Sequence, residues 1–267
     1  MTHNFVLVHG AWHGGWCWRR VAQALQLDHH KVHAVTLTGL GERAHLLMPA
    51  ITLDTHIDDV INLIEAEELH EVILAVHSYA GMIGTAVADR LGFSAPTLAA
   101  SRAALPPGGV VSPPGRIKHL VYVDAVLPKP GESWSSTQSV ATQLQRMAAA
   151  QTSPSFSFPP PDPEVFGLHD ADHAWVKRRQ TPHPGNTYQA PLDFDVQRVA
   201  AVPRTFVSCS KPALATIEPS RLRARDPKFW DGAWLPKSRF VELETGHDPM
   251  ISEPAALTKI LLDCAAA

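Results

Sequence analysis

Ser78 has the sequence surroundings in which a serine can act as a nucleophile. An apolar run at 72–76 leads into HSYAG (77–81), and helical periodicity begins directly after the serine. A serine on a sharp turn between a strand and a helix exposes its hydroxyl at the carboxyl end of a sheet. Small residues normally stand two positions before and after such a serine, but Val76 and Ala80 stand there. The pattern predicts a nucleophile and leaves open that Ser78 only caps the following helix.

His247 lies where a general base for this serine is expected. It follows Gly246 in the loop after a strand predicted at 239–244, and a further helix is predicted at 253–264. A histidine after the last strand fits the chain order serine, acid, histidine of one group of catalytic triads. We therefore interpret His247 as the base that takes the proton of Ser78.

A glycine-rich loop, HGAWHGGW (9–16), follows the first predicted strand. Glycines let the backbone pass beneath the serine, so the amide of Ala11 can face a developing oxyanion, and the amide of Tyr79 is the second expected donor. A phosphate-binding loop is excluded, because neither G-x-x-x-x-G-K-[ST] nor G-x-G-x-x-G occurs. An ordinary glycine-rich turn stays the alternative. Trp12 adjoins Ala11 and is therefore expected to contact a substrate.

Short apolar runs alternate with helical periodicity along most of the chain. Strands are predicted at 5–9, 31–35, 72–76, 119–124, 204–209 and 239–244, and helices at 16–27, 54–67, 79–91 and 253–264. This alternation indicates an α/β protein with a mostly parallel sheet that helices cover on both faces. Residues 1–125 and 202–267 are assigned to this core.

Two segments interrupt the alternation. Residues 93–116 are rich in Ala, Pro, Gly and Ser and are interpreted as a surface excursion. Residues 126–201 form a longer insertion with many prolines and with the aromatic residues Trp134, Phe156 and Trp175. This composition suits a cap over a pocket, and we expect Trp134 and Trp175 to contact the substrate.

The composition excludes several classes of protein. Of the 267 residues, 45% are hydrophobic and 18% are charged, and the formal net charge is -3. We expect neither nucleic acid nor a membrane as partner, since there is no long basic run and no window with the roughly 18 apolar residues of a membrane span. Cys17, Cys209 and Cys264 are interpreted as free thiols in a reducing, cytoplasmic compartment. His169 and His173 have the spacing of metal ligands but lack the glutamate of H-E-x-x-H, so no metal is expected.

Four stretches together resemble a known family. FVLVHGAWHGGWCW (5–18), LTGLGER (37–43), HSYAG (77–81) and GHDPMISEP (246–254) are similar to the plant methylesterase and hydroxynitrile lyase group of the α/β-hydrolase superfamily. They are more similar still to its bacterial esterase relatives, some of which hydrolyse pyrethroid, carbamate or tertiary-alcohol esters. The resemblance implies an α/β-hydrolase fold without the first hairpin of its eight-stranded sheet, a cap inserted after the sixth strand of that count, and no cofactor. It also implies that Ser78 and His247 are nucleophile and base, and that the main chain of Ala11 and Tyr79 forms the oxyanion hole.

Two carboxylates are candidates for the acid of the triad. In most relatives the acid follows the seventh strand of the fold, but CSKPAL (209–214) contains none here. Asp124 ends the strand predicted at 119–124, the strand end from which the similarly folded haloalkane dehalogenases take their acid. Glu218 lies further along the loop after the seventh strand. We favour Asp124, because a strand end holds a side chain more rigidly than a loop, and we expect its carboxylate within about 3.2 Å of His247 Nδ1.

These residues predict a serine carboxylesterase that hydrolyses a small to medium, apolar ester through an acyl-enzyme intermediate. Carbamates and amides stay open as substrates, and a homodimer stays open as the assembly. A hydroxynitrile lyase is the first alternative, but lyases similar to this chain have Thr in place of Gly10 and Lys in place of Asp248. An aspartate cannot stabilise departing cyanide. A non-catalytic receptor for small molecules is the second alternative, and the intact pair of Ser78 and His247 argues against it.

Overall fold

The sheet that positions these residues is parallel throughout. The structure, a computed structural model, describes residues 2–94 and 116–267, so most of the excursion expected at 93–116 lies outside the described residues. The described residues form a six-stranded sheet with the order β10-β9-β4-β3-β1-β2. The strands are β1 (Asn4–Val8), β2 (Lys31–Val35), β3 (Val72–His77), β4 (Ile117–Val123), β9 (Arg204–Cys209) and β10 (Ser238–Leu243). All six predicted strands are present, and their ends shift by one or two residues at most.

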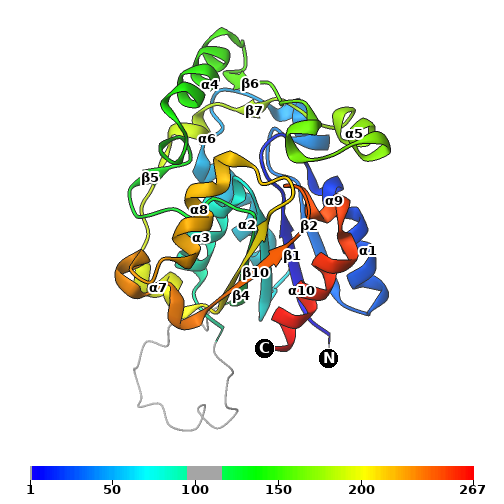
Figure 1. Cartoon of the computed structure of the whole chain (residues 1–267), viewed down its shortest axis with the longest axis vertical. Helices are drawn as coiled ribbons and strands as arrows, with labels where there is room; N and C mark the ends of the chain where they lie inside the picture. Colours follow the sequence, from blue (N-terminus) through cyan, green and yellow to red (C-terminus); the bar gives the residue numbers. More distant parts are fainter. Residues whose placement is uncertain (1, 95–115) are drawn as a thin grey trace.

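Helices cover both faces of this sheet (Figure 1). One face is covered by α1 (Arg19–Leu27), α9 (Pro249–Ser252) and α10 (Pro254–Ala266), and the other by α2 (Leu53–Ala66) and α3 (Ala80–Leu91). A further helix, α8 (Glu218–Arg225), follows β9. Because neither face meets water, every residue of β3 is buried and its sequence VILAVH is nearly continuously apolar. The predicted α/β class with a parallel sheet is confirmed.

Between β4 and β9 the chain leaves the sheet, and most of this stretch lies over the carboxyl ends of the strands (Figure 1). We call residues 126–201 the cap segment. It contains α4 (Val140–Thr152), α5 (Asp170–Lys177), α6 (Asn186–Gln189) and α7 (Val196–Ala201), with β5 (Glu132–Ser133) paired to β8 (Pro191–Leu192) and β6 (Ser157–Phe158) paired to β7 (His183–Pro184). The full α/β-hydrolase sheet has eight strands, and the two strands of its first hairpin have no counterpart before β1 among the described residues. β4, the fourth strand here, therefore corresponds to the sixth strand of the full sheet. In the structure, the cap segment lies between β4 and β9 in chain order.

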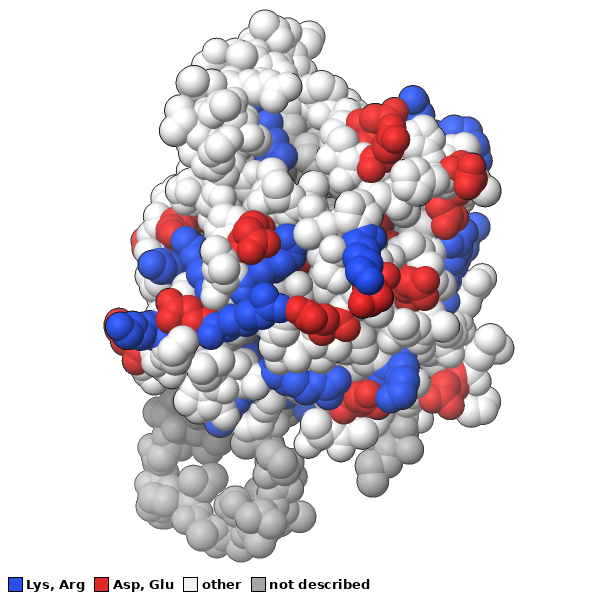
Figure 2. Space-filling model, viewed as in Figure 1, with Lys and Arg blue, Asp and Glu red and all other residues white. Residues whose placement is uncertain are grey.

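The face of the molecule in Figure 2 mixes both signs of charge. Lys and Arg lie among Asp and Glu over the lower two thirds of the view. The uppermost part of the cap segment is white apart from blue atoms in a recess. Within the described ranges, no helix is both long enough and apolar enough to cross a membrane.

Candidate active site

Ser78, His247 and Asp124 form a continuous chain of hydrogen bonds at the carboxyl edge of the sheet. Ser78 Oγ lies 2.9 Å from His247 Nε2, and His247 Nδ1 lies 2.7 Å from Asp124 Oδ2. The second distance is within the limit of about 3.2 Å expected for a hydrogen bond. Glu218 does not reach His247, since its side chain is 53% exposed and accepts a bond from Arg221 Nη1 at 3.3 Å. The geometry therefore agrees with the choice of Asp124 over Glu218.

The sharp turn between β3 and α3 is centred on Ser78. Its φ of 54° lies in the left-handed region, which is strained for a residue with a side chain. Two hydrogen bonds hold the turn: Ser78 N donates to Val123 O at 3.3 Å, and Val126 N donates to Ser78 O at 2.9 Å. Tyr79 is the N-cap residue of α3, and the Ser78 hydroxyl points to His247 instead of capping the helix.

Two glycines of α3 provide the space that the usual glycines of such a turn would give. Val76 is fully buried in β3, and a Cβ on Gly84 would lie 2.7 Å from Val76 Cγ1. A Cβ on Gly81 would lie 1.9 Å from the carbonyl oxygen of Val126. Gly81 therefore lets the backbone of Val126 pass close to the start of α3, and Gly84 leaves room for the side chain of Val76. The turn therefore tolerates Val76 two positions before the serine because Gly81 and Gly84, further along the chain, provide the space instead.

Asp124 ends β4 and is fully buried, with a φ of 40°. Arg221 of α8 binds both of its oxygens, with Nη2 2.9 Å from Oδ2 and Nε 3.1 Å from Oδ1, and Cys209 N donates to Oδ1 at 3.2 Å. These donors compensate for the burial of a charge and leave Oδ2 directed at His247. Sequence reasoning missed Arg221, because no spacing pattern links it to an aspartate 97 residues away.

The cap segment helps to hold the loop that contains His247. His247 N donates to Phe166 O at 2.8 Å, and the two ring centres lie 5.6 Å apart. A Cβ on Gly246 would lie 2.3 Å from Phe166 O. Glycine precedes the histidine because the Phe166 backbone occupies the space that a side chain would need.

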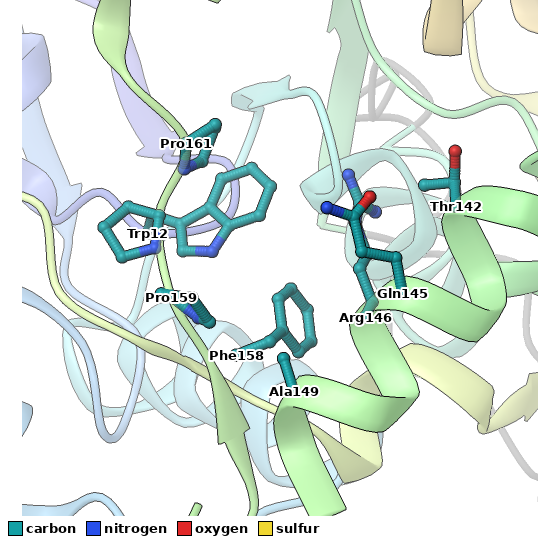
Figure 3. Close-up of a pocket in the computed structure, with 9 residues that line it drawn as sticks. Trp12, Thr142, Gln145, Arg146, Ala149, Phe158, Pro159 and Pro161 are labelled. Atoms are coloured by element: carbon teal, nitrogen blue, oxygen red, sulfur yellow. The ribbon is translucent and has the colours of Figure 1, made fainter. Parts of the chain in front are cut away.

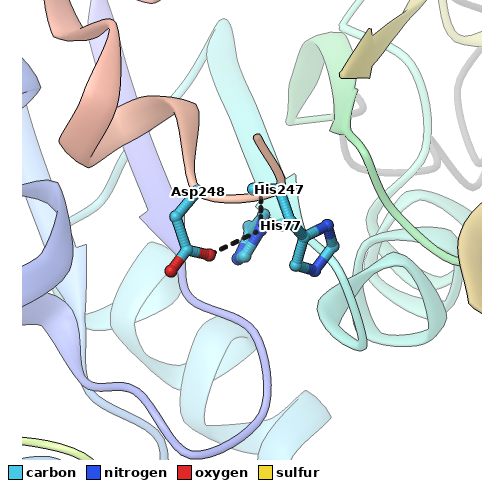
Figure 4. Close-up of side chains that lie close together, drawn as sticks. All are labelled: His77, His247 and Asp248. Atoms are coloured by element: carbon cyan, nitrogen blue, oxygen red, sulfur yellow. Dashed lines mark hydrogen bonds and ion pairs between the residues drawn. The ribbon is translucent and has the colours of Figure 1, made fainter. Parts of the chain in front are cut away.

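A second aspartate and histidine group lies beside His247 (Figure 4). Asp248 Oδ2 is 3.1 Å from His13 Nε2, and His77 Nε2 donates to His247 O at 2.9 Å while lying 3.5 Å from Asp248 Oδ1. His13 Nδ1 also bonds to Ala11 O at 2.7 Å. Burial disfavours both charges, yet Asp248 raises the pKa of His13, and His13 lowers the pKa of Asp248 to about 2. This buried ion pair ties the loop of Ala11 to the loop of His247, a link that sequence reasoning also missed.

His77, His247 and Asp248 come close enough to suggest a metal site, with ligand atoms within 4.8 Å of one another. Both ring nitrogens of His247 and Nε2 of His77 already have hydrogen-bond partners. Burial places the pKa of His77 well below its usual value, so this ring is a neutral donor to a carbonyl. We therefore interpret the group as a hydrogen-bond network. His173, considered above as a metal ligand, bonds instead to Asp162 Oδ1 at 2.6 Å.

Ala11 and Tyr79 have the two backbone amides predicted to bind an oxyanion. Among residues 2–94 and 116–267, neither N–H has a hydrogen-bond acceptor. Gly10 brings the loop of Ala11 against the nucleophile, since a Cβ at this position would lie 2.7 Å from Ser78 Cβ. A threonine, the residue expected of a lyase, does not fit this backbone.

Comparison with known proteins places the chain in a family. Residues 5–260 match the alpha/beta hydrolase family. The chain belongs to this family. It is 37% identical over 266 residues to a carbendazim hydrolyzing esterase from Nocardioides sp. (strain SG-4G), covering 97% of this chain and 98% of that relative. It is 24% identical over 277 residues to methylesterase 7 of Arabidopsis thaliana, covering 98% of this chain and 96% of that relative.

Among solved structures, an extracellular alpha/beta-hydrolase from a Paenibacillus species shares the fold with a TM-score of 0.75, at 19% identity and with 98% of each chain covered. The predicted resemblance to the methylesterase-like hydrolases is confirmed.

A cavity of about 110 Å³, which we call the inner cavity, lies at Ser78 and His247 of this hydrolase. Trp12 and Trp134 line it, as predicted for two of the three aromatic residues. The other lining residues are Arg146, Pro161, Val165, Phe166, Leu214, Thr216 and Ile217.

Trp175, the third predicted aromatic contact, is not at this cavity. Its ring packs edge-on against Trp16 with ring centres 5.0 Å apart, and Arg179 stacks over it at 4.9 Å. Helix α5 directs this tryptophan toward the loop after β1 rather than toward Ser78. We therefore remove Trp175 from the candidate substrate-binding residues.

Proposed function

We propose that this hydrolase is a serine carboxylesterase that cleaves small to medium, largely apolar esters through an acyl-enzyme intermediate. The chain of hydrogen bonds from Ser78 through His247 to Asp124, with distances of 2.9 and 2.7 Å, is the observation that supports this most directly. It borders a cavity lined mainly by aromatic and aliphatic side chains, as a site for an apolar substrate requires. The 37% identity to a carbendazim hydrolyzing esterase also supports an esterase.

In the first half of the proposed reaction, Ser78 Oγ attacks the acyl carbon while His247 Nε2 accepts the hydroxyl proton. The amides of Ala11 and Tyr79 bind the oxyanion that forms on the carbonyl oxygen. The imidazolium then gives its proton to the departing alcohol oxygen. The ester bond breaks, and the acyl group stays on Ser78.

Water completes the cycle. His247 takes a proton from a water molecule, whose oxygen attacks the acyl carbon, and Ser78 regains its proton as the carboxylic acid leaves. Asp124 stays ionised and accepts a hydrogen bond from the Nδ1–H group of His247 throughout, which fixes the tautomer and stabilises the imidazolium. Arg221 keeps Asp124 in the orientation that this bond requires.

The alternatives differ in what the site would need. A carbamate or amide would use the same nucleophile and oxyanion donors, so these substrates stay open within the proposal. A lyase acting on cyanohydrins would need a cation beside His247, but the carboxylate of Asp248 lies next to it in sequence. A receptor would need no exposed nucleophile, whereas Ser78 is held on a strained turn within hydrogen-bond distance of a histidine.

Ser78→Ala tests the proposed function. We expect the variant to lose p-nitrophenyl acetate hydrolysis, apart from a residual acceleration of roughly 10³–10⁴ over water from the oxyanion amides and binding. A fluorophosphonate reagent should label the wild-type enzyme once, and mass spectrometry of the digested protein should place the adduct on Ser78.

Ser238→Ala is the matched control, since the Ser238 hydroxyl bonds only to Leu235 O at 3.2 Å among the described residues. This variant should retain full turnover and labelling. Near-normal turnover by Ser78→Ala would rule out a serine hydrolase.

A further inference from the structure

Arg146 of α4 is a cation in an otherwise uncharged part of the cap segment. It is the only charged residue between Glu132 and Asp162 in the sequence. Its side chain nevertheless lines the inner cavity, and burial lowers the pKa of the guanidinium. Lys177, a basic residue of α5, has a carboxylate partner instead, with Nζ 2.9 Å from Asp162 Oδ2. The position of Arg146 therefore calls for an explanation other than surface solubility.

Four aromatic rings surround the Arg146 guanidinium. Its central carbon lies 4.8 Å from the ring centre of Trp134, 5.2 Å from Tyr188, 5.3 Å from Trp12 and 5.7 Å from Phe158. The ring faces attract the cation, and the Tyr188 hydroxyl is close enough to raise the pKa of the guanidinium, but it offers only one neutral oxygen. Among the described residues, Arg146 Nη1 is buried without a hydrogen-bond partner, and no carboxylate compensates the charge.

The Arg146 side chain lines two cavities. An outer cavity of about 250 Å³ is formed by one side of α4 together with Phe158 and the prolines at 159–161. Trp12, Arg146 and Pro161 line both this cavity and the inner cavity. Figure 3 shows Trp12 and the prolines facing the α4 side chains across the outer cavity. A substrate that occupied both cavities would therefore pass beside Arg146.

We propose that Arg146 binds a carboxylate of the substrate, so that the preferred esters have a second, ionised carboxyl group on the part that extends into the outer cavity. This inference rests on the proposed esterase function. A carboxylate supplies the negative charge that the partly buried guanidinium lacks and an acceptor for its unpaired Nη1, and the two planar groups fit side by side. Attraction between the two charges is stronger at a partly buried guanidinium than in bulk water. A neutral ester of the same shape would leave the N–H groups unpaired.

Two p-nitrophenyl esters with the same five-carbon acyl chain test this preference: mono-p-nitrophenyl glutarate, which is an anion at neutral pH, and its methyl ester, which is neutral. We expect Arg146→Met to lower the ratio of kcat/KM for the anionic ester to that for the neutral one about 10- to 100-fold, mainly through KM, as loss of a charged hydrogen bond does. Arg146→Lys, which keeps the charge but not the planar fork, should recover part of this ratio.

Arg179→Met is the matched control, because Arg179 also stacks on a tryptophan of the cap segment, Trp175 at 4.9 Å, but lines neither cavity. It removes the same charge from the protein and should leave the ratio as in the wild type. An unchanged ratio in Arg146→Met, or an equal fall in Arg179→Met, would overturn the proposal. Circular dichroism and thermal unfolding establish that each variant is folded.

Binding to Ser78→Ala separates this proposal from the question of hydrolysis. Calorimetry with monomethyl glutarate and dimethyl glutarate should show tighter binding of the anion, and the double variant with Arg146→Met should lose that difference. Equal affinity for the two esters would contradict the role of Arg146 even in an active esterase. If the wild-type enzyme cleaved neither p-nitrophenyl ester, the esterase function would be wrong, and the binding result would still decide the role of Arg146.

Discussion

Asp124 and Glu218 are both carboxylates near the carboxyl edge of the sheet, but they are held in different ways. Asp124 is fully buried and bonds to Arg221, Cys209 and His247. Glu218 is 53% exposed and bonds to Arg221 alone among the described residues. A buried carboxylate with fixed donors can orient an imidazole, whereas an exposed one samples many rotamers in water.

This difference predicts the effect of two substitutions of the same kind. Asp124→Asn should lower kcat on a p-nitrophenyl ester by about 10⁴, roughly 5 kcal/mol of barrier, because the amide favours the wrong tautomer of His247. Glu218→Gln should lower it less than about tenfold, because an exposed ion pair contributes little. Steady-state kinetics on folded protein measure both effects. Comparable losses in the two variants would refute the assignment of Asp124.

Arg221 should matter for stability as well as for activity. Arg221→Met leaves the Asp124 carboxylate buried without its main counter-ion, so we expect a loss of about 3–5 kcal/mol in the free energy of unfolding. Arg225→Met, which breaks an ion pair with Glu242 on the exposed surface, should cost less than about 1 kcal/mol. Urea denaturation measures both losses. Similar losses in the two variants would show that the buried ion pair contributes no more to stability than the exposed one.

The residues that could be found from the sequence are those with local signals. Ser78 stands between an apolar strand and a helix, and His247 follows a glycine after the last strand, so each is recognisable from its neighbours. His13 and Asp248 are 235 residues apart, and Arg221 is 97 residues from its aspartate. Partnerships of this kind follow from the packing of the sheet and leave no periodicity in the chain.

The same limit applies to whole elements. The six core strands were predictable because apolar runs buried on both faces differ from everything around them. The strands of the cap segment are only two residues long, too short for an alternating pattern to appear, and they pair antiparallel across 24 and 57 intervening residues. Composition does not show which way an aromatic side chain points either. It therefore could not distinguish Trp134, which follows β5 and lines the cavity, from Trp175 of α5, which does not.

Trp134 and Trp175 therefore form a natural pair of variants for the cap segment. Trp134→Ala removes a wall of the inner cavity, so we expect the relative kcat/KM values for esters with different acyl and alcohol groups to change by about tenfold or more. Trp175→Ala should leave these relative values unchanged, although it can lower stability through the lost contact with Trp16. A panel of p-nitrophenyl and alkyl esters measures the ranking. A larger change in Trp175→Ala would place the substrate elsewhere in the cap segment.

At the scale of the whole molecule, several histidines are buried as neutral rings. Burial lowers the pKa of His9 to about 3 and that of His56 to about 4, and it places the pKa of His77 and of His183 well below 6.5. The pKa of His13 is raised instead, because Asp248 outweighs the effect of burial. The native fold therefore resists protonation at four rings, each of which binds a proton readily once the chain unfolds.

Stability should consequently fall on mild acidification. Below about pH 6.5 the unfolded chain binds protons that the native rings do not, which costs about 1.4 kcal/mol per pH unit for each histidine. His13 opposes this trend, since its contribution is present at low pH and is lost as pH rises through its raised pKa. We expect the free energy of unfolding, from urea denaturation, to be lower at about pH 5.5 than at about pH 7.5 by on the order of 3–5 kcal/mol.

His183→Gln should reduce this difference by about 1.4 kcal/mol, because one buried ring is removed. His45→Gln, at an exposed position, should leave it unchanged. Equal stability at the two pH values would show that these rings are protonated in the native fold.

Cys17, Cys209 and Cys264 are all free and buried, and burial raises the pKa of each thiol. A thiol that is both inaccessible and protonated reacts slowly with maleimides. The native chain is thus ready for site-specific labelling without prior removal of its cysteines. A cysteine introduced at Ala148, on the exposed side of α4, would accept a single fluorophore, and its emission would report how α4 moves when a ligand enters the outer cavity.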